Sequence, residues 1–332
     1  MKILSTVKKI PGGLMAIPLI LGVIINTFFP GVLQIGSFTT DLWYGGAMPI
    51  LAVFLFCNSA QINVKQAAAP LAKGVILTAT ELVIGIGIGL LVNKIFGPAG
   101  FWGLTPLALI AGISNSNGGL YAALAGEFGD ASDVGAVSIL SINDGPFFTM
   151  VALGASGIAD IPVLMIVGAI LPIIVGCILG NLDEDLRKWL EPGTVILIPF
   201  FAFPLGAKLT LMQLIQAGPS GILLGVMSCL LVGIPAYFIM KLIRAKRPEI
   251  GGAIGTTAGN AAAVPENLGA AGVVTAAVAA TATAQVAAAV IVTAILCPIL
   301  VSVLSKIESK KRGEKSIDMK SEEFKEAANL SV

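Results

Sequence analysis

The sequence has no histidine among its 332 residues, and only 12% of its residues are charged. Without an imidazole, the histidine-dependent zinc and serine chemistries of many hydrolases are excluded. The charged fraction is also far below the roughly 25% of a typical soluble domain. We therefore expect neither an enzyme nor a soluble protein.

Two further absences concern cofactors. No Walker-type phosphate loop occurs, and the glycine run Gly85–Gly89 lies inside an apolar segment, where glycines favour close helix packing over phosphate binding. The four cysteines also lie in apolar segments and lack metal-ligand spacing: Cys57, Cys177, Cys229 and Cys297. We expect no cofactor, no bound structural metal and no nucleic-acid partner, and no use of ATP.

Apolar residues dominate what is present, at 56% of the chain and a mean hydropathy of +0.94. The apolar stretches are about 17 to 30 residues long, enough for a helix to cross a hydrocarbon core of roughly 30 Å. We predict an all-α polytopic protein of the lipid bilayer. Its ten predicted spans lie near residues 11–29, 45–63, 71–96, 104–127, 132–156, 161–181, 193–209, 219–243, 250–271 and 273–305.

The basic residues indicate the orientation of these spans. With both termini in the cytoplasm, only Lys94 and Lys208 lie outside the inner segments and the basic tail. The first apolar segment ends at Pro30 without a small-residue cleavage site, so we read it as a retained span and not a signal peptide. This pattern predicts a multi-pass protein of a bacterial inner membrane.

Two apolar spans, the fourth and the ninth, carry matching breaks. The first break is Gly112-Ile-Ser-Asn-Ser-Asn-Gly-Gly119, and the second is Gly255-Thr-Thr-Ala-Gly-Asn-Ala-Ala262. Polar, glycine-rich backbone is tolerated at membrane depth only where protein or water satisfies it. A pair of such breaks in two halves of a chain is typical of the substrate site of a secondary transporter.

An internal repeat supports this interpretation. Phe54 aligns with Phe201, Gly74 with Gly221 and, after a small shift, Asn117 with Asn260. Each half has five spans, so the second enters the membrane from the opposite side, which predicts two inverted repeats in residues 1–156 and 161–305 and a polar cytoplasmic tail in 306–332. Chance similarity between apolar segments is the competing explanation.

Side chains at the breaks offer both donors and acceptors. Half-helix ends carry unpaired N–H groups that suit a substrate carboxylate. Hydroxyl and amide groups suit a small polyol acid, and they equally suit a sodium ion. The candidate residues are Ser114, Asn115, Ser116 and Asn117 in the first break and Thr256, Thr257, Asn260 and Asn267 in or just after the second.

Three carboxylates inside the spans are candidates for ion coupling, because a chain without histidine must carry a proton on Asp or Glu. Glu266 follows the second break, Asp144 lies in the distorted segment Ser141-Ile-Asn-Asp-Gly-Pro146, and Glu81 lies in the third span. A helix cap or a structural hydrogen bond is the alternative role for each. Lys208 either pairs with a substrate carboxylate or reaches the outer interface.

Several of these motifs together resemble a known family. Ile10-Pro-Gly-Gly13, Asn115-Ser-Asn-Gly-Gly119, Ser141–Pro146, and Gly259-Asn260 with Pro265-Glu-Asn267 are similar to those of the bacterial 2-keto-3-deoxygluconate permease family, over nearly all ten spans. This resemblance implies proton-coupled import of a small sugar acid, 2-keto-3-deoxygluconate, across the inner membrane.

The resemblance also implies a fold and site roles. Kinship with bile acid sodium symporters and sodium/proton antiporters implies two crossing broken helices, a core of spans 3–5 and 8–10, and a panel of spans 1–2 and 6–7. The substrate carboxylate would lie near Asn115, Asn117 and Asn260, with its hydroxyls near Gln61 and Asn267. Glu266 or Asp144 would carry the coupling charge, with Asn143 beside it, and a sodium ion at Asn115 and Glu266 remains an alternative. Three further alternatives remain open: a sodium-coupled symporter of another organic anion, an ion antiporter and a homodimeric state.

Overall fold

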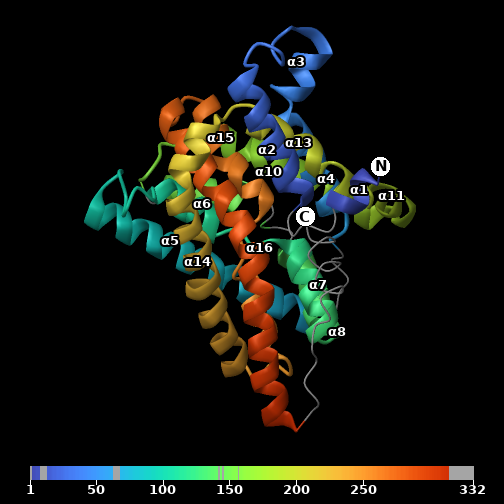
Figure 1. The fold of residues 1–332 in the computed structure, drawn as a ribbon. Coiled ribbons are helices and arrows are strands. Elements are labelled where there is room, and N and C mark those ends of the chain that lie inside the picture. The colour runs from blue at the N-terminus through green and yellow to red at the C-terminus, as the bar shows by residue number, and fades with distance from the viewer. Residues whose placement is uncertain are drawn as a thin grey trace.

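The computed structural model describes residues 2–7, 13–62, 68–140, 143, 146–155 and 157–313. Within these ranges the chain is helical, and its one β-bridge joins Phe101 to Leu104. The α-helices and two 3-10 helices, η1 and η2, are shown in Figure 1. Their bounds are α1 (Ile3–Val7), α2 (Gly13–Phe28), α3 (Ser37–Trp43), α4 (Ala47–Ala60), α5 (Ala68–Phe96), α6 (Pro106–Ile113), α7 (Gly118–Phe128), α8 (Ala131–Leu140), α9 (Phe147–Ala155), α10 (Val163–Leu182), α11 (Glu184–Leu190), α12 (Gly193–Ile196), α13 (Ile198–Gly206), α14 (Leu211–Leu242), η1 (Pro248–Ile254), η2 (Gly259–Ala262), α15 (Ala263–Ala270) and α16 (Ala276–Arg312).

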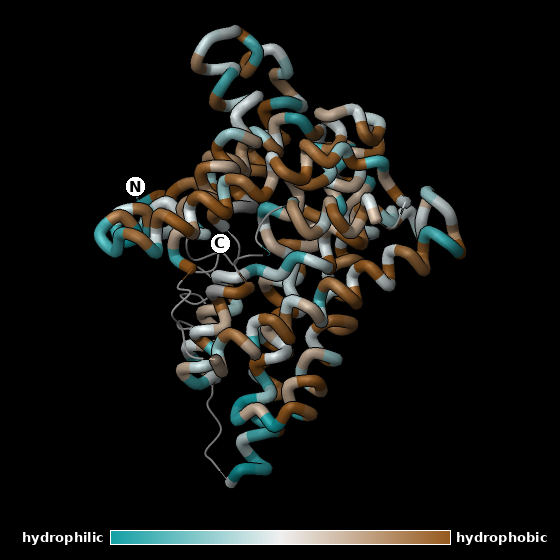
Figure 2. Tube along the Cα trace, turned by 180° about the vertical axis from the view of Figure 1, so that it is seen from behind, coloured by the Kyte–Doolittle hydropathy of each residue, from teal (hydrophilic) through white to brown (hydrophobic). Residues whose placement is uncertain are grey.

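Five helical segments of the described chain are long and apolar enough to cross a membrane, and a sixth is the pair α3 and α4, which is bent by 59°. The five lie in Ala68–Phe96, Val163–Leu182, Glu184–Gly206, Ile215–Leu242 and Ala276–Arg312. This confirms an all-helical membrane protein, and Figure 2 shows apolar residues along most of its helices. The remaining predicted spans correspond to shorter or interrupted helices.

Two helices are longer than the sequence pattern suggested. α14 begins at Leu211, ahead of the predicted start at 219, because Thr210 and Gln213 form a reciprocal capping box there. α16 continues to Arg312, past the predicted boundary at 305, and ends at Gly313 in the left-handed conformation. The polar tail therefore begins as a continuation of the last helix.

One group of helices comprises α2, α4, α10 and α13. It is closely packed because glycines face neighbouring backbone: a Cβ at Gly206 would lie 1.9 Å from the Leu19 carbonyl oxygen, and one at Gly180 would lie 2.0 Å from that of Ala60. Small residues at such contacts are the usual way that membrane helices approach one another. These four helices lie together in the upper part of Figure 1.

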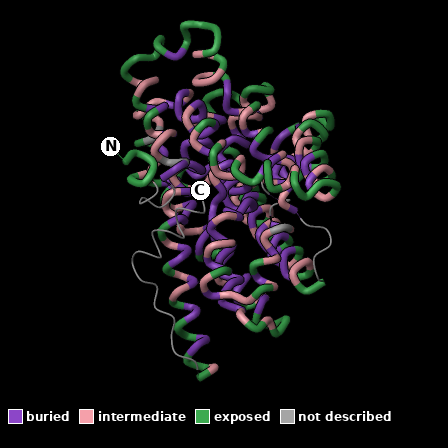
Figure 3. The backbone as a smooth tube through the Cα atoms, turned by 90° about the vertical axis from the view of Figure 1, so that its right-hand side faces the viewer, coloured by how far each residue is buried: buried purple, intermediate pink, exposed green. Residues whose placement is uncertain are grey.

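The second group comprises α5 to α9 and α14 to α16, with η1 and η2 between α14 and α15. α14 and α16 pack against each other along much of their length and descend together to the lower end of the molecule (Figure 1). Gly74 on α5 meets Ile139 of α8, and Gly221 on α14 meets Ala288 of α16. Buried residues concentrate where the helices meet, as Figure 3 shows in purple, and both breaks lie in this group.

Candidate functional site

The first break separates α6 from α7. α6 ends at Ile113 and α7 begins at Gly118, and the four residues between them, Ser114 to Asn117, are all buried. The Asn117 side chain caps α7 by accepting a hydrogen bond from the Leu120 N–H at 2.9 Å. Asparagine at the N-cap and glycine after it explain why the helix restarts here. The N-terminal end of a half-helix is thus held inside the protein.

The second break lies between η1 and α15. A run of glycine, threonine and alanine replaces regular α-helix with two short 3-10 segments before α15 begins at Ala263. Thr256, Thr257 and Asn260 are each at most 3% exposed. Their hydroxyl and amide groups are consequently available only to partners inside the protein.

The two breaks meet and hydrogen-bond directly. The Ala258 N–H donates to the Asn115 carbonyl at 2.8 Å, and the Asn115 amide donates to Asn260 Oδ1 at 3.3 Å. The Asn117 N–H donates to Thr256 Oγ1 at 2.8 Å, and Thr257 Oγ1 donates to the Gly112 carbonyl at 2.8 Å. Residues almost 150 positions apart in sequence therefore form one polar crossing in an apolar protein.

A carboxylate lies behind the first break. Glu81 on α5 is fully buried and accepts a short hydrogen bond from the Asn143 side-chain amide. The same amide nitrogen donates to the Ser114 carbonyl at 2.6 Å, and Ser114 Oγ lies 3.2 Å from Thr149 Oγ1. Asn143 therefore links the Glu81 carboxylate to the backbone of the break through two hydrogen bonds.

Among the described residues, hydroxyl groups hydrogen-bond the backbone behind the second break. Ser228 on α14 donates to the Thr256 carbonyl at 3.1 Å, and Thr293 on α16 accepts from the Thr257 N–H at 3.0 Å. The unwound backbone is satisfied as it is in the first break, but by neutral groups. The two halves of the crossing thus differ in charge.

A glycine on a long helix approaches each break. A Cβ at Gly85 on α5 would lie 2.9 Å from the Ser114 nitrogen. One at Gly233 on α14 would lie 2.8 Å from Leu300 Cδ2, 3.0 Å from the Gly252 carbonyl oxygen in η1 and 3.5 Å from the Gly255 Cα at the start of the second break. Gly87, two residues from Gly85, faces open space. Close helix packing, expected for the Gly85–Gly89 run, is what the structure shows for Gly85.

Glu266 is one turn into α15 and pairs with Lys208, just after α13. Lys208 Nζ lies 2.7 Å from Glu266 Oε1 and 5.9 Å from the centre of the Tyr44 ring. The lysine and tyrosine belong to the first group of helices and the glutamate to the second. This ion pair therefore joins the two groups.

A second charged cluster lies within one group. Lys73 on α5 pairs with Asp133 and, at 3.3 Å, with Asp130 in the connection between α7 and α8. Partial burial alone would raise the pKa of Asp130, but hydrogen bonds from Ser132 and the Asp133 N–H, together with the charge of Lys73, hold that pKa well below its ordinary value. The aspartate thus stays ionised and holds the α7–α8 connection against α5.

Other predicted site residues lie apart from these bonds or lack a described partner. The Gln61 amide donates to the Arg187 carbonyl at 3.1 Å, so it holds α4 against α11. Ser116 is buried and Asn267 half-buried, and neither side chain hydrogen-bonds another described residue. Asp144 lies outside the described residues.

Sequence reasoning missed Thr149 and Thr293 as members of the site. Each is a single hydroxyl residue in an apolar helix, which gives no local signal of function. Ser228 was visible only as the repeat counterpart of Glu81.

Comparisons with known proteins identify the family of the chain. The profile of a family described as 2-keto-3-deoxygluconate permease (KdgT) matches residues 4–310. "2-keto-3-deoxygluconate permease 1" of Salmonella typhimurium is 49% identical over 312 residues, which cover 93% of this chain and 98% of that relative. "2-keto-3-deoxygluconate permease" of Pectobacterium carotovorum subsp. carotovorum (strain PC1) is 42% identical over 271 residues, covering 80% and 85%.

The corresponding permease of Escherichia coli O9:H4 (strain HS) is 40% identical over 271 residues, covering 80% of this chain and 83% of that relative. A permease is a transporter and not an enzyme, as the sequence led us to expect. On the strength of a match that spans nearly the whole chain, the protein belongs to the 2-keto-3-deoxygluconate permease family.

Proposed function

We propose that the chain imports 2-keto-3-deoxygluconate by proton symport through alternating access, with the hydrogen-bonded crossing of the two breaks as its substrate site. The observation that carries the proposal is the direct bonding of Asn115 to Asn260 and Ala258 beside a buried carboxylate. The substrate is inferred from the printed names of the relatives.

The substrate carboxylate is placed at the N-terminal end of α7. Unpaired N–H groups and the helix dipole favour an anion there. Asn115, Asn117 and Asn260 surround this position, and Ser116 lies beside them with no hydrogen bond from its side chain to the described residues. Thr257 and Asn267 supply further donors and acceptors for substrate hydroxyls.

Glu81 is the coupling residue that the geometry favours most. It is fully buried, and a buried carboxylate costs much less free energy when a proton neutralises it. Through Asn143 it acts on the Ser114 carbonyl, so protonation and the shape of the first break are linked. Glu266, by contrast, is partly exposed and paired with Lys208.

Sodium coupling is a second candidate, because oxygen atoms gather at the same place. Ser114 Oγ and Thr149 Oγ1 lie 3.2 Å apart next to Asn143 and Glu81, and hard cations prefer such oxygen ligands. In this alternative the ion sits where the proton would otherwise bind, near Asn115. The Lys208–Glu266 pair then acts as a latch between the two moving parts.

The two groups of helices correspond to the proposed panel and core. In this assignment ten spans form two inverted repeats, with both termini in the cytoplasm and Lys208 at the outer side. The equivalent close contacts of Gly74 with α8 and Gly221 with α16 support the repeat. So does the equivalent approach of Gly85 and Gly233 to the two breaks.

Uptake into proteoliposomes tests the function. Radiolabelled 2-keto-3-deoxygluconate is supplied with an imposed pH gradient, with a sodium gradient, or with neither. Accumulation driven by the pH gradient supports proton symport, and accumulation driven only by sodium supports the second candidate. Failure to accumulate under both would overturn coupled uptake of this substrate.

A further inference from the structure

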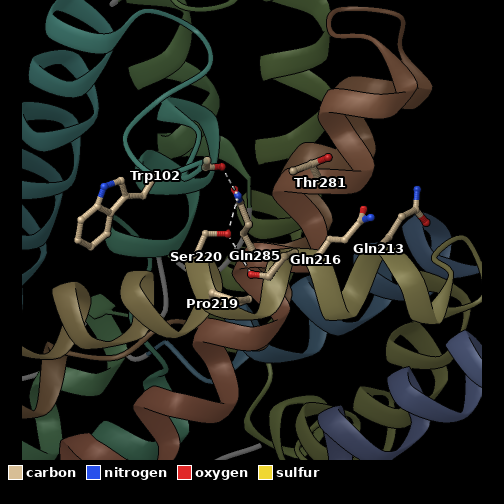
Figure 4. A pocket seen from close by; sticks show the side chains of 9 residues that line it. Trp102, Gln213, Gln216, Pro219, Ser220, Thr281 and Gln285 are labelled. Atoms are coloured by element: carbon tan, nitrogen blue, oxygen red, sulfur yellow. Dashed lines mark hydrogen bonds between the residues drawn. The ribbon is translucent and has the colours of Figure 1, made fainter.

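A cavity with several polar lining residues lies apart from the breaks, at the end of the molecule where α14 and α16 begin. It has a volume of about 270 Å³ and is closed on one side by the connection between α5 and α6 (Figure 4). Sites for drug-sized ligands are roughly 300 to 1,000 Å³, so this cavity suits a smaller molecule. Its polar lining residues are Gln213, Gln216, Ser220, Thr281 and Gln285.

The lining carries no charged side chain, and its hydrogen-bonding groups are mainly amides and hydroxyls. Gln216 makes no hydrogen bond to the described residues, and Gln213 uses only its Oε1, to cap α14, so its amide N–H groups are available. Thr281 Oγ1 donates to the Ala277 carbonyl and keeps its lone pairs free. Amides and hydroxyls present donors and acceptors together, as a chain of sugar hydroxyls requires.

A hydrogen-bond network holds the back wall of the cavity in place. Gln285 donates to the Gly103 carbonyl and to Ser220 Oγ at 3.0 Å (Figure 4). Its Oε1 accepts from Thr105 Oγ1 at 3.2 Å. Thr105 is the N-cap of α6. α6 has 8 residues, about 12 Å of helix, so the cavity lies one short helix away from the first break.

The rim of the cavity is a strained turn. Trp102 and Gly103 both have positive φ, 50° and 75°, between reciprocal backbone hydrogen bonds that join Phe101 and Leu104. Glycine adopts such angles readily, but a bulky aromatic residue does not. Backbone strain of this kind persists where the surrounding structure enforces it, and it concentrates at functional sites.

We propose that this cavity is a binding site for the hydroxylated carbon chain of a sugar or sugar acid, separate from the crossing. With no charged side chain in the lining, it recognises hydroxyls and not the carboxylate. Its role as a first-contact site on the outer face rests on the proposed uptake function. The binding of a polyol in the cavity does not depend on that proposed function.

Trp102 supplies the signal for a test, since the chain has three tryptophans. The full chain carrying Trp43→Phe and Trp189→Phe, reconstituted in nanodiscs, is titrated with 2-keto-3-deoxygluconate, gluconate and sorbitol. Pyruvate, a keto acid without a polyol chain, is the control ligand. We expect a saturable change in Trp102 emission with the three polyols and none with pyruvate.

Three variants assign the signal to the cavity. In the same background, Gln216→Leu with Thr281→Val removes at least one hydrogen bond and weakens binding about five- to tenfold, as expected for about 1 kcal/mol per bond. Gln34→Leu, the same change at an exposed glutamine outside the cavity, leaves binding unchanged. Asn115→Ala, which alters the crossing, also leaves the Trp102 response in place.

The outcomes separate this proposal from the proposed function. A Trp102 response that depends on Gln216 and Thr281 supports the cavity even if no uptake occurs. If uptake occurs and the double variant raises KM without lowering the maximal rate, the first-contact role is supported as well. A response absent for all three polyols, unchanged in the double variant, or lost in Asn115→Ala would overturn the site.

Discussion

The two breaks have similar backbone contacts, but the side chains behind them differ in charge. Each interrupts a buried helix, each is approached by a glycine from a long neighbouring helix, and each contributes hydrogen bonds to the other. Behind the first break lie Glu81 and Asn143, and behind the second lie Ser228 and Thr293. The first break thus lies against a carboxylate, and the second against neutral hydroxyl groups.

This difference bears on how transport is coupled. An uncharged break satisfies its backbone permanently, because hydroxyl donors do not change with the ion gradient. A break that rests on a carboxylate changes when the carboxylate gains or loses a cation. We therefore expect ion coupling to reside in the first half and the second half to serve mainly substrate binding and packing.

The largest expected effect is that of Glu81→Gln. The amide keeps the size of the side chain but cannot release a proton, so we expect it to abolish gradient-driven accumulation while exchange of substrate at equilibrium continues. The measurement is uptake against counterflow in proteoliposomes. Ser228→Ala, the matched change behind the second break, should keep gradient-driven uptake, and normal accumulation by Glu81→Gln would remove Glu81 from the coupling mechanism.

Asn115 and Asn260 test the contact between the breaks. We expect each single alanine variant to weaken substrate binding about fivefold or more, because it removes a buried hydrogen bond of about 1 kcal/mol and a substrate contact. A double-mutant cycle on substrate affinity measures their coupling. Fully additive single effects would mean that the bond at 3.3 Å contributes nothing to the site.

The prediction of the breaks and the omission of their supporting residues have one physical cause. Glycine, asparagine and serine inside an apolar run disfavour continuous helix whatever surrounds them, so the two breaks could be located from local sequence. Which distant side chain faces a break depends on how helices pack. Thr149 and Thr293 are ordinary helix residues until that packing is known.

The same limit explains the candidates that lie elsewhere. Gln61 was expected beside the substrate hydroxyls, but its amide donates to the Arg187 carbonyl at the end of α4. The sequence specifies the helix on which a residue lies, whereas the partner of a side chain at a helix end depends on how the helices pack. The sequence showed that Glu266 and Lys208 are charged. It did not show that they pair, because they lie on different groups of helices.

Gly85→Ala is expected to have an intermediate effect. Its Cβ would lie 2.9 Å from the Ser114 nitrogen, and overpacking of this kind typically costs about 1 to 3 kcal/mol. We expect a lower thermal stability and slower uptake, measured together on purified protein and proteoliposomes. Gly233→Ala, at 3.0 Å from the Gly252 carbonyl oxygen, should match it, and Gly87→Ala in open space should not change either property.

Glu266→Gln is expected to have the smallest effect of these variants. It tests the comparison of the two breaks, because Glu266 is the carboxylate that follows the neutral second break. Its partner Lys208 has a side chain that is 31% exposed, and partly exposed ion pairs contribute about 1 kcal/mol or less. If the pair is a latch between the two groups of helices, Glu266→Gln changes the uptake rate at most severalfold and leaves its dependence on the gradient intact. Lys208→Met should do the same, and combining the two should add little, since either change already breaks the pair. Loss of gradient dependence in Glu266→Gln alone would instead place a coupling charge behind both breaks and make the two halves electrostatically equivalent.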